Sequence, residues 1–203
     1  MTIPTFDGLV FDERSHTYTL NGMKLPSVTT IMRPLSNEYY GSIDRSILDT
    51  AAKRGTTVHQ AIENWLKFGY DDIPEEHSGY YSAFKNWLDE NSPRLIEAES
   101  RVYHKVFRYA GTADLPCIIN SEVICVDFKT SVNIVEMLAR VQLEAYAKAY
   151  ESHGFKFSEK AIVQLKSDGC YKMVRYKAGD GEAWEVFCGL LTAYNYLSKY
   201  GNK

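Results

Sequence analysis

An aspartate and a lysine stand two residues apart at the end of an apolar run. The run is VICV at residues 123–126, and Asp127, Phe128 and Lys129 follow it directly. Residues two apart on a strand point to the same face, so the acid and the base would lie side by side. Burying an ion there costs free energy unless the ion is paired or bound to a metal. Short D-x-K strings are common, and for this pair alone a salt bridge at the strand end is the simpler interpretation.

A second aspartate, Asp114, precedes Asp127 by thirteen residues in an adjacent predicted strand. A tight hairpin through Asn120-Ser121 would place the two aspartates next to each other. Adjacent carboxylates repel, and a divalent cation relieves that repulsion. Lys129 could then hold the negative charge of an attacking water or of a phosphoryl group. Taken alone, Asp114 is more typical of a surface aspartate near a turn.

A histidine and a glutamate, His59 and Glu63, stand four residues apart in a stretch with helical spacing. Residues at this spacing share one face of a helix. The pattern differs from the HExxH of zinc proteases, and a lone helical histidine is more typical of a packing residue. Gln142 and Tyr146 have the same spacing, and both types are also common on a half-exposed helix edge. What distinguishes these residues is their order along the chain relative to the aspartates and the lysine.

The elements that would position these residues follow from the hydrophobic pattern. A strand, a turn and a second strand are predicted within 9–20, and further strands near 97–109, 112–119, 123–129, 160–167 and 171–177. Helices are predicted near 27–33, 44–68 with a break near Gly55, 79–91, 132–152 and 181–199, whereas 36–50 is less definite. Pro116 predicts a bulge or a sheet edge in its strand. This order of elements indicates an α/β fold layered around a mixed sheet.

Length, charge and cysteine spacing limit the classes of protein. The 203 residues suffice for one domain with a sizeable core. A net charge of −3 argues against passive nucleic-acid packaging, but it suits an enzyme whose carboxylates bind metal. The four cysteines form no CxxC pair, which argues against a zinc site. We see no signal peptide or membrane-length apolar stretch, and we therefore expect a cytoplasmic protein with reduced thiols and no membrane contact.

Four short motifs, GTTVH, GTAD, DFK and QLEAY, occur in this order. The set resembles the RecB-type branch of the PD-(D/E)xK nuclease superfamily, which includes RecB, Cas4-like exonucleases and the mitochondrial genome maintenance exonuclease. Each motif is weak singly, but four in order on suitable elements form a specific signal over residues 54–146. The resemblance implies a restriction-endonuclease-like core, with a central mixed β-sheet flanked by helices. We expect one nuclease domain over 1–203, with a lead-in at 1–50 and a catalytic core at about 51–200.

The resemblance also implies roles for individual residues. The expected metal ligands are His59, Asp114, Asp127 and the backbone carbonyl of Phe128. Lys129 would orient the nucleophilic water, while Gln142 and Tyr146 would support the site or hold the DNA strand. Glu63 would be a further acid near the metal, and Glu99 a weaker candidate of the same kind. Candidate DNA contacts outside the core are Arg45, Lys53, Arg54, Arg101, Lys105, Arg108, Arg140, Tyr39, Tyr40, Tyr80 and Tyr81.

The activity that the resemblance implies is hydrolysis of DNA phosphodiester bonds with Mg²⁺ or Mn²⁺, leaving a 5′-phosphate and a 3′-hydroxyl. We expect an exonuclease in phage or bacterial recombination, repair or DNA end processing, within a bacterial or phage-infected cell. Its partners would be single-stranded DNA or duplex ends, with a recombination or single-strand-binding protein as a candidate. A structure-specific or restriction-type endonuclease and a catalytically idle DNA-binding subunit are the alternatives. The cysteine spacing argues against the iron–sulfur cluster of some relatives.

Overall fold

A five-stranded mixed sheet forms the centre of the computed structural model, which describes residues 3–201. Its strands, in spatial order, are β10 (Tyr171–Lys177), β9 (Glu159–Leu165), β8 (Glu122–Lys129), β7 (Leu115–Ile119) and β4 (Arg94–Leu95). β8 and β9 are parallel and every other neighbouring pair is antiparallel. The parallel pair requires a crossover, which contains α5 (Glu136–Glu151).

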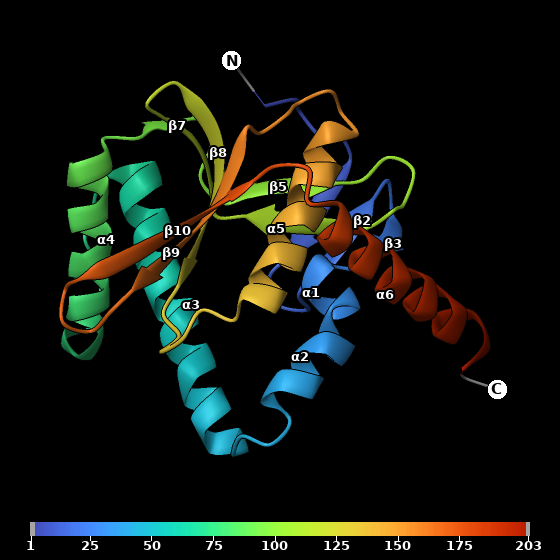
Figure 1. The fold of residues 1–203 in the computed structure, drawn as a ribbon, viewed down its shortest axis with the longest axis horizontal. Helices are drawn as coiled ribbons and strands as arrows, with labels where there is room; N and C mark the ends of the chain where they lie inside the picture. Colours follow the sequence, from blue (N-terminus) through green and yellow to red (C-terminus); the bar gives the residue numbers. More distant parts are fainter. Residues whose placement is uncertain (1–2, 202–203) are drawn as a thin grey trace.

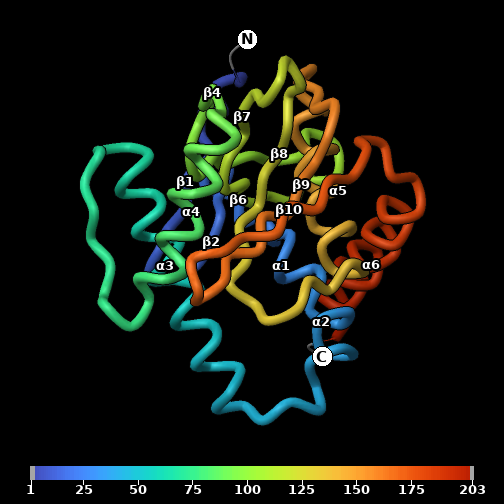
Figure 2. The backbone as a smooth tube through the Cα atoms, turned by 60° about the vertical axis from the view of Figure 1, so that its left-hand side comes forward, coloured from blue at the N-terminus to red at the C-terminus, as the bar shows by residue number. Residues whose placement is uncertain are grey.

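Helices cover both faces of this sheet (Figures 1 and 2). α3 (Arg45–Phe68) and α4 (Ser78–Asn91) pack on one face, and α5 with the first half of α6 (Gly181–Tyr200) packs on the other. β8 is apolar on both sides: Ile124, Val126 and Phe128 join the core under α3 and α4, and Cys125 joins the core under α5. The mixed α/β class, with a central sheet flanked by helices, is therefore as predicted.

Two smaller sheets lie beside the central one. The first contains β1 (Leu9–Asp12), β2 (Thr17–Leu20) and β3 (Met23–Leu25); the second contains β5 (Ser100–Tyr103) and β6 (Ala110–Ala113). The Tyr18 hydroxyl lies 2.7 Å from the Thr112 hydroxyl and ties the two sheets together. Two short helices, α1 (Val28–Ile31) and α2 (Arg33–Tyr40), follow β3, and a 3₁₀ turn, η1 (Glu75–His77), precedes α4. Residues from both small sheets, from α1 and from α2 line cavities that reach Lys129 at the end of β8.

Several predicted boundaries were wrong. The strand expected at 97–109 is only β5, because the chain turns between His104 and Tyr109 and returns as β6, which pairs with β5; the strand expected at 112–119 is divided between β6 and β7. α3 runs through Gly55 without the expected break, and α5 begins at Glu136 instead of 132. α2 occupies part of the segment that was left less definite. Within residues 3–201, every helix is too short or too polar to span a lipid bilayer.

Candidate active site

The end of β8 holds an ion pair between Asp127 and Lys129. Asp127 is buried, Lys129 is half-buried, and the Lys129 Nζ lies 2.6 Å from the Asp127 Oδ2. Burial alone lowers the pKa of Lys129, but the carboxylates of Asp127 and Asp114 outweigh that effect and raise it. Lys129 therefore keeps its positive charge at the end of β8, where it lines a cleft together with His59 and Glu63. β9 pairs with β8 along this stretch and keeps the strand straight.

Asp114 lies at the junction between β6 and β7, where the chain passes from the small sheet into the central one. Its Oδ2 accepts a hydrogen bond of 2.7 Å from the backbone N–H of Phe128. This bond aims the carboxylate at the end of β8, as the hairpin argument predicted. Burial raises the pKa of Asp114 to about 7; the negative charges of Asp127 and Glu99 add to the rise, and His59 opposes it.

His59 reaches the same point from α3. Its Nε2 lies 3.0 Å from the Phe128 carbonyl oxygen, and its Nδ1 lies 3.5 Å from the Asp114 Oδ2. Because a carbonyl only accepts, Nε2 carries the proton of that bond and Nδ1 faces the carboxylates. Burial lowers the pKa of His59, but Asp114 and Glu99 outweigh it and raise the value to about 9. The Nδ1 proton thus lies where a cation would bind.

Glu99 completes the acidic group, although the sequence ranked it below Glu63. The ligand atoms of His59, Glu99 and Asp114 all lie within 4.8 Å of one another. The backbone N–H of Glu99 donates to the Asp114 carbonyl oxygen at 2.8 Å, and Glu99 itself has a φ of 52°. A left-handed conformation is uncommon for a glutamate and points this side chain inward. Two carboxylates and one imidazole suit Mn²⁺ or Mg²⁺.

The expected ligand set therefore divides into two adjacent groups. His59 and Asp114 lie together with Glu99, while Asp127 contacts Lys129 and the Phe128 carbonyl accepts the bond from His59. That carbonyl fixes the ring of His59, as outer partners of metal-bound histidines commonly do. The ligand roles of Asp127 and Phe128 remain predictions.

Glu63 lies one helical turn beyond His59 on the wall of the same cleft. Its carboxylate is 2.6 Å from the Lys67 Nζ and accepts a hydrogen bond from Gln60. The cleft has a volume of about 800 Å³, and Glu63, His59 and Lys129 all line it. Glu63 is thus near the candidate metal group without belonging to it. Its catalytic role remains a prediction.

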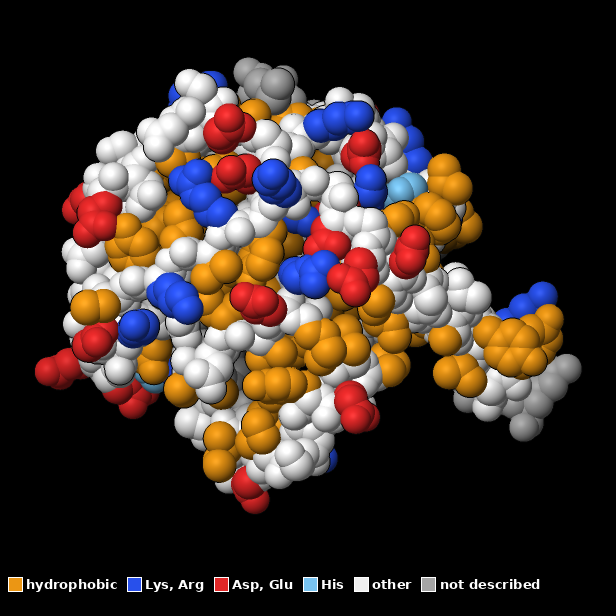
Figure 3. Space-filling view, viewed as in Figure 1, with side chains coloured by type: hydrophobic (Ala, Val, Ile, Leu, Met, Phe, Trp, Pro, Cys, Tyr) orange, Lys and Arg blue, Asp and Glu red, His pale blue; other side chains and the backbone are white. Residues whose placement is uncertain are grey.

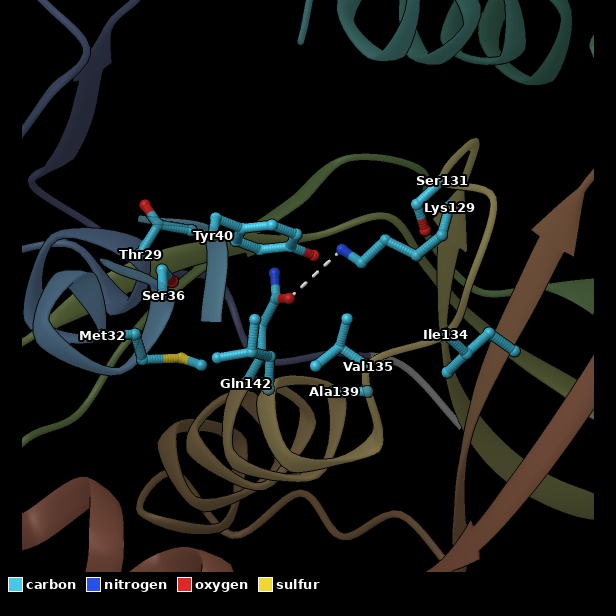
Figure 4. A pocket seen from close by; sticks show the side chains of 11 residues that line it. Thr29, Met32, Ser36, Tyr40, Lys129, Ser131, Ile134, Val135, Ala139 and Gln142 are labelled. Atoms are coloured by element: carbon cyan, nitrogen blue, oxygen red, sulfur yellow. Dashed lines mark hydrogen bonds between the residues drawn. The ribbon is translucent and has the colours of Figure 1, made fainter. Parts of the chain in front are cut away.

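Gln142, seen in Figure 4, and Tyr146 both approach from α5 on the opposite side. The Gln142 Oε1 accepts a hydrogen bond of 3.2 Å from Lys129, and its Nε2 donates to the Tyr146 hydroxyl at 3.1 Å. The Tyr146 ring lies against the backbone of Gly111, where a Cβ would come within 2.5 Å of the ring. Only glycine leaves room for this ring, so Gly111 of GTAD and Tyr146 of QLEAY fit together in this chain.

Among the candidate DNA contacts, the structure separates those that border the site from those that do not. Arg101 and Lys129 line the acidic cleft, and Arg54 donates to the Thr130 carbonyl beside it. Arg140 instead pairs with Asp180 at 2.7 Å, at the start of α6. The side chains of the candidate site come from five places in the fold: α3, the start of β5, the β6–β7 junction, β8 and α5. These places are separated in the sequence and meet only in the folded chain.

Comparisons with known proteins gave similarities to solved structures only, since no family model and no curated protein matches the sequence. An alkaline exonuclease from Laribacter hongkongensis is 10% identical, with a TM-score of 0.42 over 72% of this chain and 84% of that chain. A phage-related exonuclease from Haemophilus somnus 129PT is 10% identical, with a TM-score of 0.43 over 83% and 91%. A protein named SSO0001 is 19% identical, with a TM-score of 0.40 over 56% of this chain and 55% of its own length.

Proposed function

We propose that this chain is a metal-dependent deoxyribonuclease of the PD-(D/E)xK type that hydrolyses phosphodiester bonds from DNA ends. The observation that carries the proposal is the position of the His59–Glu99–Asp114 group beside the Asp127–Lys129 ion pair. A group of acids and one neutral imidazole would bind a divalent cation, and a lysine next to it would meet an anion. Hydrolysis of a phosphodiester needs both a cation and a positive group for the developing charge.

His59, Glu99 and Asp114 would hold the cation, with Asp127 as a further ligand. Bound Mg²⁺ or Mn²⁺ supplies Lewis-acid polarisation of the phosphate and lowers the pKa of a bound water. Lys129 would orient the attacking water and stabilise negative charge on it. Asp127 fixes the ammonium from one side and Gln142 from the other, so Lys129 is held in place before substrate arrives. Tyr146 fixes the amide of Gln142 in turn.

We further propose that residues 1–203 act as one nuclease domain in DNA recombination, repair or end processing. The hydrogen bond between Tyr18 and Thr112 supports a single domain, because it joins the N-terminal sheet to the strand that leads into Asp114. A structure-specific endonuclease on the same core is the second candidate. A catalytically idle DNA-binding subunit is the third, and the paired Lys129 argues against it because such a subunit needs no charge at that point.

The deciding experiment is digestion of end-labelled single-stranded and duplex DNA, with covalently closed circular DNA as a third substrate. We expect cleavage of the linear DNA with Mg²⁺ or Mn²⁺, loss of cleavage with a chelator, and an intact circle. Lys129→Met is the informative variant, and Lys172→Met, an exposed lysine on β10, is the matched control. Cleavage of the circle would favour the endonuclease. A folded, DNA-binding protein that cleaves none of the three would favour the idle subunit.

A further inference from the structure

A second hollow lies on the other side of Lys129 from the acidic cleft. It has a volume of about 210 Å³ and lies between the α1–α2 segment and the start of α5. Its walls are mainly apolar, with Met32 and Tyr40 on one side and Val135 and Leu138 on the other. Figure 4 shows the Tyr40 hydroxyl directed toward the Lys129 ammonium, and Gln142 between Tyr40 and α5. We call this hollow the ring pocket.

The ring pocket is continuous with the candidate active site. Thr29 and Lys129 line both the ring pocket and the acidic cleft that contains His59. At its far side, Tyr40 and Val135 also line a larger apolar hollow of about 420 Å³. The three cavities therefore differ in lining on the two sides of Lys129. The cleft on one side has acidic groups suited to a cation, and the ring pocket and larger hollow on the other have aromatic and aliphatic walls.

The size and the lining of the ring pocket select a class of occupant. An apolar cavity of about 150 Å³ holds benzene, so the ring pocket has room for a planar ring of slightly greater size. Lys129, Gln142 and the Tyr40 hydroxyl meet at one edge of the pocket, and Thr29, Ser36 and Ser131 add hydroxyl groups to its lining. A flat group with an apolar face and a polar edge fits such walls. A nucleobase is the part of DNA that has this form.

Hydrophobic side chains continue beyond the pocket on the same face. Figure 3 shows them over the lower part of the molecule, where α2 and the beginning of α3 lie. Tyr39, Ile43 and Ile47 are exposed there and line the larger hollow. Unstacked bases would find apolar contact along this route, whereas the sugar–phosphate backbone of a duplex would not.

We propose that the ring pocket holds one unpaired nucleobase of the strand whose phosphate lies at His59, Glu99 and Asp114, with the Tyr40 ring as its main contact. The proposal rests on the proposed nuclease function and deepens it. A base in this pocket is withdrawn from its complementary strand, so the enzyme acts on single-stranded DNA or on a nucleotide separated from its partner. Tyr40 is then a specificity-determining residue.

The test uses single-stranded oligonucleotides in which one abasic site is moved position by position past the cleaved bond. For the parental protein we expect KM to rise about tenfold at one position and to stay unchanged at the others, since a base stacked on an aromatic ring contributes about this much. Tyr40→Ala should raise KM to a similar extent with little change in kcat. The abasic site should then have no further effect.

Matched variants separate base contact from general damage. Tyr40→Phe keeps the ring and should keep the parental KM. Ser36→Trp adds bulk to the pocket wall without emptying the core, and it should raise KM even where Tyr40→Ala folds poorly. Tyr196→Ala removes an exposed tyrosine from α6, outside both hollows, and should change nothing. Mn²⁺ affinity measured by calorimetry should be the same in all four variants.

A binding experiment distinguishes failure of this proposal from failure of the nuclease assignment. 2-Aminopurine placed at the sensitive position should lose fluorescence when the parental protein binds, and this loss should disappear in Tyr40→Ala. Absence of cleavage by the folded parental protein would contradict the nuclease assignment. Cleavage without any position-dependent abasic effect, or without a KM change in Tyr40→Ala and Ser36→Trp, would contradict the ring pocket as a base site. Efficient cleavage at internal bonds of a fully paired duplex, away from its ends, would also contradict it.

Discussion

The charges at the end of β8 are unevenly matched. Three carboxylates, on Glu99, Asp114 and Asp127, share a small volume with the imidazole of His59 and the ammonium of Lys129. Burial is the main cause of the raised pKa of Asp114, and the neighbouring acids add to it, whereas Asp114 and Glu99 raise the pKa of His59 against its burial. A divalent cation would displace the protons of both groups. Metal binding should therefore release protons and strengthen as pH rises past about 7, where Asp114 loses its proton, toward about 9, where His59 does.

The first prediction concerns His59. His59→Ala should weaken Mn²⁺ binding at least tenfold and reduce cleavage by about a hundredfold or more, because one ligand of the group is lost. The parental protein should work with Mg²⁺ or Mn²⁺ and often better with Mn²⁺, for which imidazole is the better ligand. Titration calorimetry and cleavage rates check this, with His77→Ala as the control. A His59→Ala protein that melts early but binds metal and cleaves normally would make His59 a packing residue.

The second prediction concerns the ion pair. Lys129→Ala should reduce cleavage by about a hundredfold or more. It should also lower the free energy of unfolding by roughly 1–3 kcal/mol, because Asp127 stays buried without its partner. The double variant Asp127→Asn, Lys129→Met should recover much of that stability but none of the activity. Denaturant unfolding and cleavage assays separate the two effects, and a folded Lys129→Ala protein with near-parental cleavage would exclude the proposed role.

At the scale of elements, the contact between β6 and α5 carries the third prediction. Gly111→Ala should cost about 1–3 kcal/mol of stability, because the added methyl collides with the Tyr146 ring. The displaced ring would release Gln142 and hence Lys129, so kcat should fall more than KM changes. Gly189→Ala is the control, since a Cβ at that position on α6 meets open space. Equal kcat values for the two variants would show that Tyr146 does not position the lysine.

The loop between β5 and β6 carries the fourth prediction. The His104 Nδ1 accepts hydrogen bonds from the backbone N–H groups of Val106 and Phe107 at 3.2 Å, which requires a neutral ring. Burial lowers the pKa of His104 to about 4, with a smaller effect from His153. The unfolded chain, with an ordinary value near 6.5, binds the proton first. The contribution of neutral His104 to the free energy of unfolding should therefore be fully present above pH 6.5 and be lost as the pH falls toward 4.

This pH dependence can be measured by urea unfolding between pH 4 and 8. In His104→Gln, the side-chain oxygen accepts hydrogen bonds without titrating over that range. The variant should therefore lose less stability than the parental protein between pH 6.5 and 4. Identical slopes for the two proteins would show that other groups govern the acid response.

The accuracy of the sequence predictions varied between elements for physical reasons. β8, α5 and the Asn120-Ser121 turn were predicted because their patterns are local, and both turn residues have positive φ as a tight hairpin requires. The 97–109 strand was wrong because nothing local marks the turn that His104 closes by accepting backbone hydrogen bonds. Glu99 was ranked low because only its left-handed backbone and its bond to the Asp114 carbonyl bring it to the site.

Of two further predictions, the break at Gly55 failed, whereas of the two alternatives predicted for Pro116 the structure shows the sheet edge and not the bulge. Gly55 does not break α3. Asp44 caps the N-terminus of this helix, and Gly69, in a left-handed conformation, ends it. The expected bulge at Pro116 is absent from the β7–β8 register, where Pro116 pairs opposite Cys125. Its carbonyl oxygen accepts from the N–H groups of Ile96 and Glu97, beyond the end of the two-residue β4. Proline has no backbone N–H to donate. This is tolerated at Pro116 because β4 has already ended on that side of β7.

At the scale of the whole molecule, the negative net charge is compatible with the proposed anionic substrate because charge is distributed unevenly. Lys129 separates an acidic cleft from an apolar route, and many acids on other surfaces pair with neighbouring bases, as Glu159 does with Arg175. The C-terminal half of α6 extends away from the rest of the molecule with Tyr196, Leu197 and Tyr200 exposed (Figures 1 and 3). The candidate site lies away from this extension, at the meeting point of all three sheets.

The parallel pairing of β8 with β9 has a consequence for the newly made chain. A ribosome that has released the first 150 residues has already released every residue of the candidate site, from His59 to Tyr146. The strand that pairs with Asp127 and Lys129, however, is still to come, because Ile162 and Gln164 of β9 lie beyond the crossover. Until β9 docks, β8 is an exposed edge and its ion pair has no rigid support. Under the proposed function, the capacity to cut DNA should therefore appear only after β9 has been synthesised and has docked beside β8.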